Sequence, residues 1–152
     1  MRLTLHTDYA LRMLMFLALE PGSPRTIEDI ATRFCISRNH MMKVAQTLVQ
    51  AGFIESLRGR GGGLRLAREP TTLRLGDIVR ATEDGFTIVE CFDGSSNTCI
   101  VSAACGLRNP LQEALTAFLG VLDRYTIADL VKNPATARRM QRLLSPKASA
   151  VH

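Results

Sequence analysis

The chain has 152 residues, which is enough for one compact domain, or for one small domain with an extension. A hydrophobic content of 46% against 22% charged residues excludes wholesale disorder, and the absence of Trp with only 5% aromatic residues argues against a carbohydrate or aromatic-stacking site. Nineteen Lys and Arg against fourteen Asp and Glu give a net charge of +5, which suits a polyanionic partner.

The first predicted helix covers residues 7–20, where apolar residues recur at helical spacing, with Thr7 as its N-cap and the Pro-Gly pair at 21–22 as its stop. Asp8 and Arg12 lie inside this apolar pattern, so the segment is neither a membrane-spanning helix nor a signal peptide. Elsewhere, too, no apolar run approaches the roughly 18 residues of a span. We therefore expect a cytoplasmic protein with no membrane partner.

Two short helices follow, residues 26–34 capped by Thr26 and residues 38–50 capped by Ser37. The three or four residues between them are typical of a helix-turn-helix. The predicted buried stripe of the second helix is Met41, Val44, Ala45, Leu48 and Val49. Its opposite face begins with side chains that suit base edges and phosphates, and the predicted contacts are Ser37, Arg38, Asn39, His40 and Lys43.

A glycine-rich hairpin is predicted next, with strands at 53–57 and 63–67. Arginines in such a wing enter a minor groove or bind phosphates, and glycines allow close approach of the backbone. The predicted DNA contacts here are Arg58, Arg60, Gly61, Gly62 and Gly63. A solvated turn or a phosphate-binding P-loop are the alternatives, but no G-K-[ST] follows, and the basic residues gather on the helix pair and the hairpin together.

Three of the four cysteines lie in one long loop. After a short helix predicted at 73–81, helical periodicity is lost over 82–108, where Cys91, Cys99 and Cys105 form C-x7-C-x5-C. Three thiolates suit an iron–sulfur cluster but leave one ligand missing. Structural zinc, completed by a His or Asp, and three unrelated buried thiols are the alternatives. We expect Cys35 to be a core thiol.

The predicted longest helix begins at Asn109-Pro110, with Pro110 in the first turn. Its apolar residues follow the 4-3-4-3 spacing of a coiled-coil seam: Leu111, Leu115, Phe118, Leu122 and Tyr125. This is more apolar surface than one small domain covers, so we predict a homodimer through this helix, which also suits a palindromic operator with two half-sites. A turn or short helix at 126–131 and a helix at 134–144 follow.

These features together resemble the family of NsrR and IscR regulators. The resemblance covers about residues 1–130 and rests on the opening LTLHTDYALR at 3–12, SRNHMMKV at 37–44, GRGGG at 59–63 and the three-cysteine loop, all in the family's order. It implies a homodimeric winged-helix protein with an iron–sulfur cluster near the dimer interface. NsrR-type members are repressors that respond to nitric oxide.

The resemblance also implies a ligand set. Cys91, Cys99 and Cys105 would be the thiolates, and Asp8 of the partner subunit would be the carboxylate ligand. IscR-type proteins use a His just after the third cysteine, whereas Gly-Leu-Arg follows Cys105 here, which favours the NsrR type. His6 is an alternative ligand, and Asp8 has an ordinary role open to it as a helix-dipole partner and an ion-pair partner of Arg12. Both 4Fe-4S and 2Fe-2S clusters fit.

The sequence therefore predicts a mainly α fold with a small β-hairpin: a winged helix-turn-helix with a long dimerisation helix. The expected divisions are a DNA-binding region at 1–82, a cluster-binding loop at 83–108, the dimerisation and C-terminal helices at 109–145, and a flexible tail at 146–152. We predict a nitric-oxide-responsive repressor of double-stranded DNA and no enzyme. An IscR-type regulator of iron–sulfur status or redox state, or a zinc or thiol regulator on the same fold, is the alternative.

Overall fold

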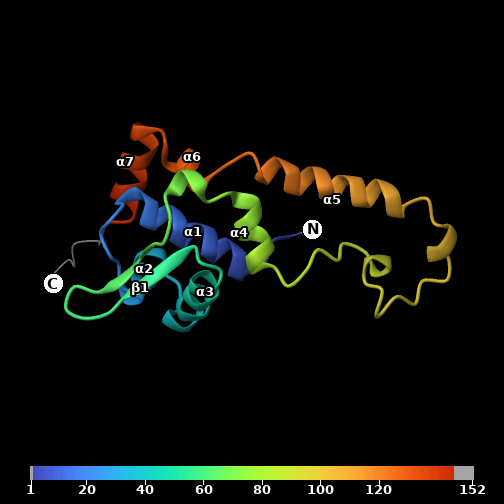
Figure 1. The fold of residues 1–152 in the computed structure, drawn as a ribbon, viewed down its shortest axis with the longest axis horizontal. Coiled ribbons are helices and arrows are strands. Elements are labelled where there is room, and N and C mark those ends of the chain that lie inside the picture. The colour runs from blue at the N-terminus through green and yellow to red at the C-terminus, as the bar shows by residue number, and fades with distance from the viewer. Residues whose placement is uncertain (1, 146–152) are drawn as a thin grey trace, which may run out of the picture.

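The computed structural model describes residues 2–145, so the predicted tail at 146–152 lies outside the described residues. The chain is mainly helical with one two-stranded antiparallel sheet, which confirms the predicted fold class (Figure 1). The helices and strands are α1 (Leu5–Leu19), α2 (Ile27–Phe34), α3 (Arg38–Gln50), β1 (Ile54–Leu57), β2 (Gly63–Leu66), α4 (Leu75–Thr82), α5 (Arg108–Leu122), α6 (Ile127–Val131) and α7 (Pro134–Leu143).

Helix α1 is the centre of the core, and α3, α4 and α6 all pack on it. Its fully buried side chains include Met13 and Leu14, which meet Ile30 of α2, Leu48 of α3 and Ile78 of α4. Burying each such aliphatic side chain contributes about 1.5–3 kcal/mol, so the helix pair that carries the predicted DNA contacts rests on a well-packed base.

The start of α1 differs from the sequence prediction. The N-cap is Thr4, whose side chain accepts a hydrogen bond from the amide of Thr7 at 3.2 Å, and Thr7 itself is fully buried inside the helix. Two threonines three residues apart are equally good caps in sequence. Tertiary contacts decide between them, because Thr4 also donates two hydrogen bonds to Glu83, the residue that follows α4.

The turn between α2 and α3 is tight. Thr26 and Ser37 cap the two helices as predicted, and α2 ends at Cys35, whose φ of 54° is left-handed. The prediction of Cys35 as a core thiol is wrong, since this residue is exposed at the turn. Val49, predicted in the buried stripe of α3, is 41% exposed, because α3 turns that side toward solvent.

The wing is the hairpin of β1 and β2, with Ile54 paired to Leu66 and Leu57 to Gly63. It is attached to the segment before α2 by two backbone hydrogen bonds between Arg25 and Leu64, of 2.9 and 2.8 Å. The base of the wing is therefore fixed close to the helix pair, whereas the glycine-rich tip between β1 and β2 lies outside this contact.

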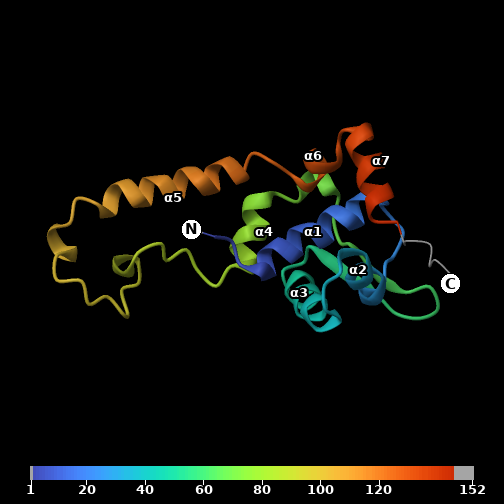
Figure 2. The ribbon, with the colours of Figure 1, turned by 180° about the vertical axis from the view of Figure 1, so that it is seen from behind.

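Helix α5 projects away from this body, and the long loop runs from the end of α4 alongside α5 to the far end of that helix (Figures 1 and 2). Pro110 is the third residue of α5, which begins earlier than predicted. The prediction that this is the longest helix is wrong, because α5 and α1 both have 15 residues. Among residues 2–145, no helix is both long and apolar enough to cross a membrane.

The chain then returns to the body through α6 and α7. Ile127 of α6 is fully buried, and its amide bonds the carbonyl of Leu73 at 2.9 Å. Helix α7 is held by Gln141, which donates to the carbonyl of Leu19 at 3.3 Å, and by Arg33, which donates to the carbonyl of Leu144 at 2.5 Å. The C-terminal end of α5 is therefore held at the body by α6 and α7.

Candidate nucleic-acid interface and cysteine loop

The solvent face of α3 carries the predicted DNA contacts. Ser37 uses its hydroxyl to cap the helix at the amide of His40, at 3.3 Å, so its side chain is already engaged. Arg38, Asn39, His40 and Lys43 are all exposed. Because the first turns of such a helix approach base edges in known helix-turn-helix complexes, this face has the placement that DNA reading requires.

Two of these side chains have protein partners. Arg38 lies 3.4 Å from the carboxylate of Glu28, an exposed pair of small energetic value. The ring of His40 lies 6.1 Å from that of Tyr9 in α1, measured between centroids. Asn39 and Lys43 instead line an open groove between α3 and the wing. The four residues therefore differ in how freely they can meet DNA.

Two residues of this groove were missed by the sequence prediction, Met42 and Gln46. Both are exposed, and they lie three and seven residues after Asn39 on the same side of α3. That spacing is the signal that finds them, because residues i, i+3 and i+7 share one face of a helix. The reading face of α3 is therefore longer than its first turn.

The wing arginines separate into two kinds. Arg65 pairs with Glu55 across the hairpin at 2.6 Å, and Arg68 packs on the ring of Phe53, 5.4 Å from its centroid. Arg58 and Arg60 are exposed at the tip, and within the described residues neither makes an ion pair. The two predicted contacts are thus the arginines that are free to bind phosphates.

The wing glycines have distinct geometries. Gly61 has a φ of +81°, which favours glycine, and open space around it. A Cβ on Gly62 would collide with the carbonyl oxygen of Leu57, and one on Gly63 would lie 2.8 Å from the backbone of Arg25. The structure thus gives these glycines a role in shaping the wing, and contact with DNA stays a prediction for all three.

The three loop cysteines are free thiols of intermediate burial on a segment with two short 3-10 turns, Glu90–Phe92 and Ser102–Ala104. Three soft thiols on an irregular, polar loop have the donor chemistry that an iron–sulfur cluster or zinc requires. Across residues 2–145, however, no three His, Cys, Asp or Glu side chains come together to hold a metal ion. The donors fit such a group chemically, but one chain by itself does not bring them together.

Hydrogen bonds to carboxylates organise the loop around its cysteines. Glu90 accepts from the amide and hydroxyl of Thr98, at 2.5 and 2.6 Å, and these bonds lower its pKa. Because Glu90 precedes Cys91 and Thr98 precedes Cys99, this contact holds the two cysteine backbones near each other. Between them, Asp93 accepts hydrogen bonds from two serines, which lower its pKa to about 2.

Asp8 lies in the first turn of α1. Its carboxylate pairs with Arg12 at 2.6 and 3.1 Å, and the guanidinium of Arg12 lies 5.8 Å from the centroid of Tyr9. Tyr9 in turn contacts His40 of α3. A contiguous set of contacts therefore connects Asp8 with the DNA-facing helix. His6, the alternative ligand, lies 3.1 Å from the hydroxyl of Thr47 in α3.

Glu83 joins the start of the loop to the start of α1. It accepts hydrogen bonds from the amide and hydroxyl of Thr4, at 2.8 and 3.0 Å. Partial burial would raise the pKa of Glu83, but hydrogen bonds from Thr7 and Thr4 outweigh it and lower the pKa overall. These hydrogen bonds connect the start of the helix that carries Asp8 to the start of the loop that carries the cysteines.

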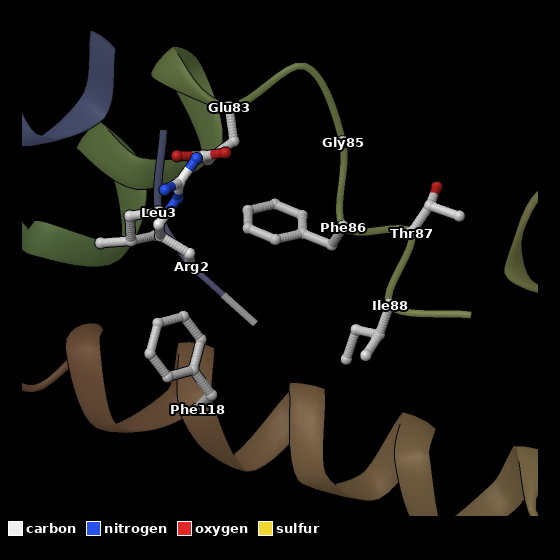
Figure 3. A pocket seen from close by; sticks show the side chains of 8 residues that line it. All are labelled: Arg2, Leu3, Glu83, Gly85, Phe86, Thr87, Ile88 and Phe118. Atoms are coloured by element: carbon white, nitrogen blue, oxygen red, sulfur yellow. The ribbon is translucent and has the colours of Figure 1, made fainter. Parts of the chain in front are cut away.

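A cavity of about 330 Å³ lies beside this anchor, between the N-terminal segment, the loop and α5 (Figure 3). Leu3, Phe86, Ile88 and Phe118 give it an apolar lining, and Figure 3 shows them converging on it from all three segments. The polar side chains that line it are Arg2, Glu83 and Thr87.

The chain matches the Rrf2 family, an iron-dependent transcriptional regulator, over residues 3–133. It is 54% identical to the HTH-type transcriptional regulator NsrR of Bacillus subtilis, over 88% of this chain and 92% of that protein. The NsrR protein of Bacillus licheniformis is 46% identical, over 92% and 99%. The structure of T. potens IscR superposes with a TM-score of 0.70 at 27% identity, over 87% of each chain. These findings confirm the resemblance and the winged-helix fold.

Proposed function

The chain belongs to the Rrf2 family of transcriptional regulators, and we propose that it is a nitric-oxide-responsive repressor whose DNA affinity is controlled by an iron–sulfur cluster. The observation that carries this proposal is the loop with three free thiols, joined by Glu83 to the helix below the DNA-facing surface. The NsrR names of the relatives support the nitric oxide signal.

We assign Cys91, Cys99 and Cys105 as three ligands and Asp8 of the partner subunit as the fourth. The loop extends from the end of α4 to the far end of α5, away from the body that contains α1 (Figures 1 and 2), and among residues 2–145 no three potential metal ligands come together. A single chain therefore offers three thiols without the carboxylate, and this supports a ligand from a second copy. When bound, the cluster supplies a centre that reacts with nitric oxide.

The second copy would bind along α5. Leu115 is buried within its own chain, but Leu107, Val121 and Tyr125 are exposed. The apolar cavity lined by Phe86 and Phe118 adjoins the same helix. This uncovered apolar surface supports a homodimer, and a homodimer presents two copies of α3 to the two half-sites of an operator.

The described contacts suggest how Asp8 influences DNA binding. A carboxylate that serves as a ligand gives up its pairing with Arg12, and a released carboxylate regains it. Arg12 packs on Tyr9, which contacts His40 in α3. We propose that the two arrangements of Asp8 favour two positions of α3, which is the differential preference that coupling between two sites requires.

Anaerobic purification tests the nature of the site. We expect a brown protein with broad visible absorbance, with iron and sulfide present by elemental analysis, that bleaches on nitric oxide. A colourless protein that contains zinc would overturn the cluster. Bleaching by oxygen or iron starvation but not by nitric oxide would instead identify an IscR-type regulator of cluster status.

The Asp8→Ala variant tests the fourth ligand. We expect it to form a dimer and to load a cluster that a chelator removes faster than from the wild type. Asp8 and Arg12 form a partly exposed i,i+4 pair worth only about 0.3–0.5 kcal/mol, so cluster-free Asp8→Ala should unfold at nearly the wild-type temperature. Equal cluster lifetimes in both proteins would exclude Asp8, and His6→Ala then tests the alternative.

A further inference from the structure

Met42 is an exposed apolar side chain on the DNA-facing helix α3. It is 42% exposed on α3, whereas its neighbour Met41 is fully buried in the core. Among the described residues of α3, the exposed large apolar side chains are Met42 and Val49, and only Met42 lies in the half of the helix nearer Ser37. It is therefore placed among the side chains that approach base edges.

The groove around Met42 has both apolar and polar lining residues, and its other apolar members are Ile27, Ala45, Val49 and Leu64. It has a volume of about 490 Å³, and Asn39, Lys43 and Gln46 line it from the same helix. Lys43 makes no ion pair within residues 2–145, and the free arginines Arg58 and Arg60 lie at the tip of the neighbouring wing. Positive charge beside the groove suits DNA, and two amides offer both donors and acceptors.

We propose that Met42 is a specificity-determining residue that reads thymine through its C5-methyl group. In the major groove, the thymine methyl is the one apolar group that a base edge presents, so it is the complement of an apolar side chain placed among polar reading residues. The flexible, polarizable thioether of Met adapts to such a contact. This inference rests on the proposed contact of α3 with DNA.

The test removes the thymine methyl group and the Met42 side chain separately. An operator is first selected from random duplexes by the cluster-loaded wild-type protein. Each thymine of one half-site is then replaced singly by deoxyuridine, which lacks the methyl group, and dissociation constants are measured by fluorescence anisotropy. Burying one methyl group corresponds to roughly a fourfold change in affinity.

We expect one thymine at which deoxyuridine weakens wild-type binding about fourfold and leaves Met42→Ala binding unchanged. Met42→Leu should retain the penalty, because leucine is also apolar. Gln50→Ala is the matched control and should retain the penalty in full, because Gln50 is exposed on the same helix but is not among the residues that line the groove.

Two results would overturn the inference. If Met42→Ala keeps the full deoxyuridine penalty at every thymine, or if no thymine shows a penalty in the wild type, Met42 does not read a methyl group although α3 binds DNA. If the wild type selects no sequence from the random pool, the proposed DNA contact itself is wrong and the inference is lost with it.

Discussion

Gly63 is a residue at which the wing passes close to the backbone of Arg25, before α2. An added Cβ would lie 2.8 Å from both the carbonyl carbon and the carbonyl oxygen of Arg25. These are backbone atoms that also pair with Leu64 through two hydrogen bonds, so they cannot move aside without breaking the pairing. The identity of this residue therefore fixes the position of the wing.

We expect Gly63→Ala to lower the free energy of unfolding by about 2 kcal/mol, roughly the value of two backbone hydrogen bonds. Urea unfolding followed by circular dichroism, at matched protein concentration, measures it. Gly94→Ala is the control, because Gly94 has open space around it and no positive φ, and it should change stability by less than about 0.5 kcal/mol. Equal stability of the two variants would contradict the close approach.

Helices α4 and α5 are joined by one bidentate ion pair. Arg80 donates to the two carboxylate oxygens of Asp123 at 2.6 and 2.7 Å, and this hydrogen bonding lowers the pKa of Asp123. Gly76 makes the approach possible, because a Cβ there would collide with the Asp123 carboxylate. The pair stabilises the fold above the ordinary carboxyl pKa of 3.8, and its contribution is lost as the pH falls through the lowered value.

We expect carboxyl NMR to show Asp123 titrating below its ordinary range in the wild type. Arg80→Gln removes the donor and should return the pKa of Asp123 towards its usual value, and Gly76→Ala should act in the same direction by holding the carboxylate away. An unshifted Asp123 in the wild type, or a shift that survives both changes, would contradict this contact.

The cysteine loop depends on the bond between Glu90 and Thr98. Thr98→Val keeps the size of the side chain but removes the hydroxyl that donates to Glu90 at 2.6 Å. The segments that bear Cys91 and Cys99 then lose one of the two hydrogen bonds between Glu90 and Thr98. We expect less iron and sulfide per chain after reconstitution, and faster loss to a chelator.

Thr87→Val is the matched control for this loop. Thr87 is exposed in the same segment and, among the described residues, its side chain makes no hydrogen bond. The Thr87→Val variant should bind as much iron and sulfide per chain as the wild type. If Thr98→Val loads equally well, the Glu90 contact has no part in holding the cysteines.

The range of an interaction decides whether the local sequence predicts it. Thr26 and Ser37 were identified as caps because a cap bonds backbone amides two or three residues away. Thr7, Cys35 and Val49 were misjudged, because burial depends on how a helix docks against distant elements. The meeting of three cysteines is harder still, since local periodicity carries no information about where a loop folds or what a second chain adds.

The whole molecule has an elongated arm that its own body does not cover (Figure 1). A charge on the exposed apolar side of α5 should therefore disrupt association without harming the chain's own core. We expect Val121→Asp to give a monomer by sedimentation, with a normal helical circular dichroism spectrum, and to bind DNA more weakly because two half-sites are no longer engaged together.

Thr116→Asp controls for the added charge. Thr116 lies five residues away, roughly 140° around the helix from Val121, and is exposed. It should leave the oligomeric state unchanged. A wild-type protein that sediments as a monomer, or a Val121→Asp variant that sediments with the wild type, would contradict association through this side of α5.

The central claim, that the cysteine loop controls DNA binding, is tested most directly by one anaerobic titration. The cluster-loaded protein is titrated against its selected operator before and after addition of nitric oxide, with zinc-loaded and metal-free protein alongside. We expect tight binding before nitric oxide and about a hundredfold weaker binding after it, which corresponds to roughly 3 kcal/mol. Equal affinity before and after nitric oxide would contradict it.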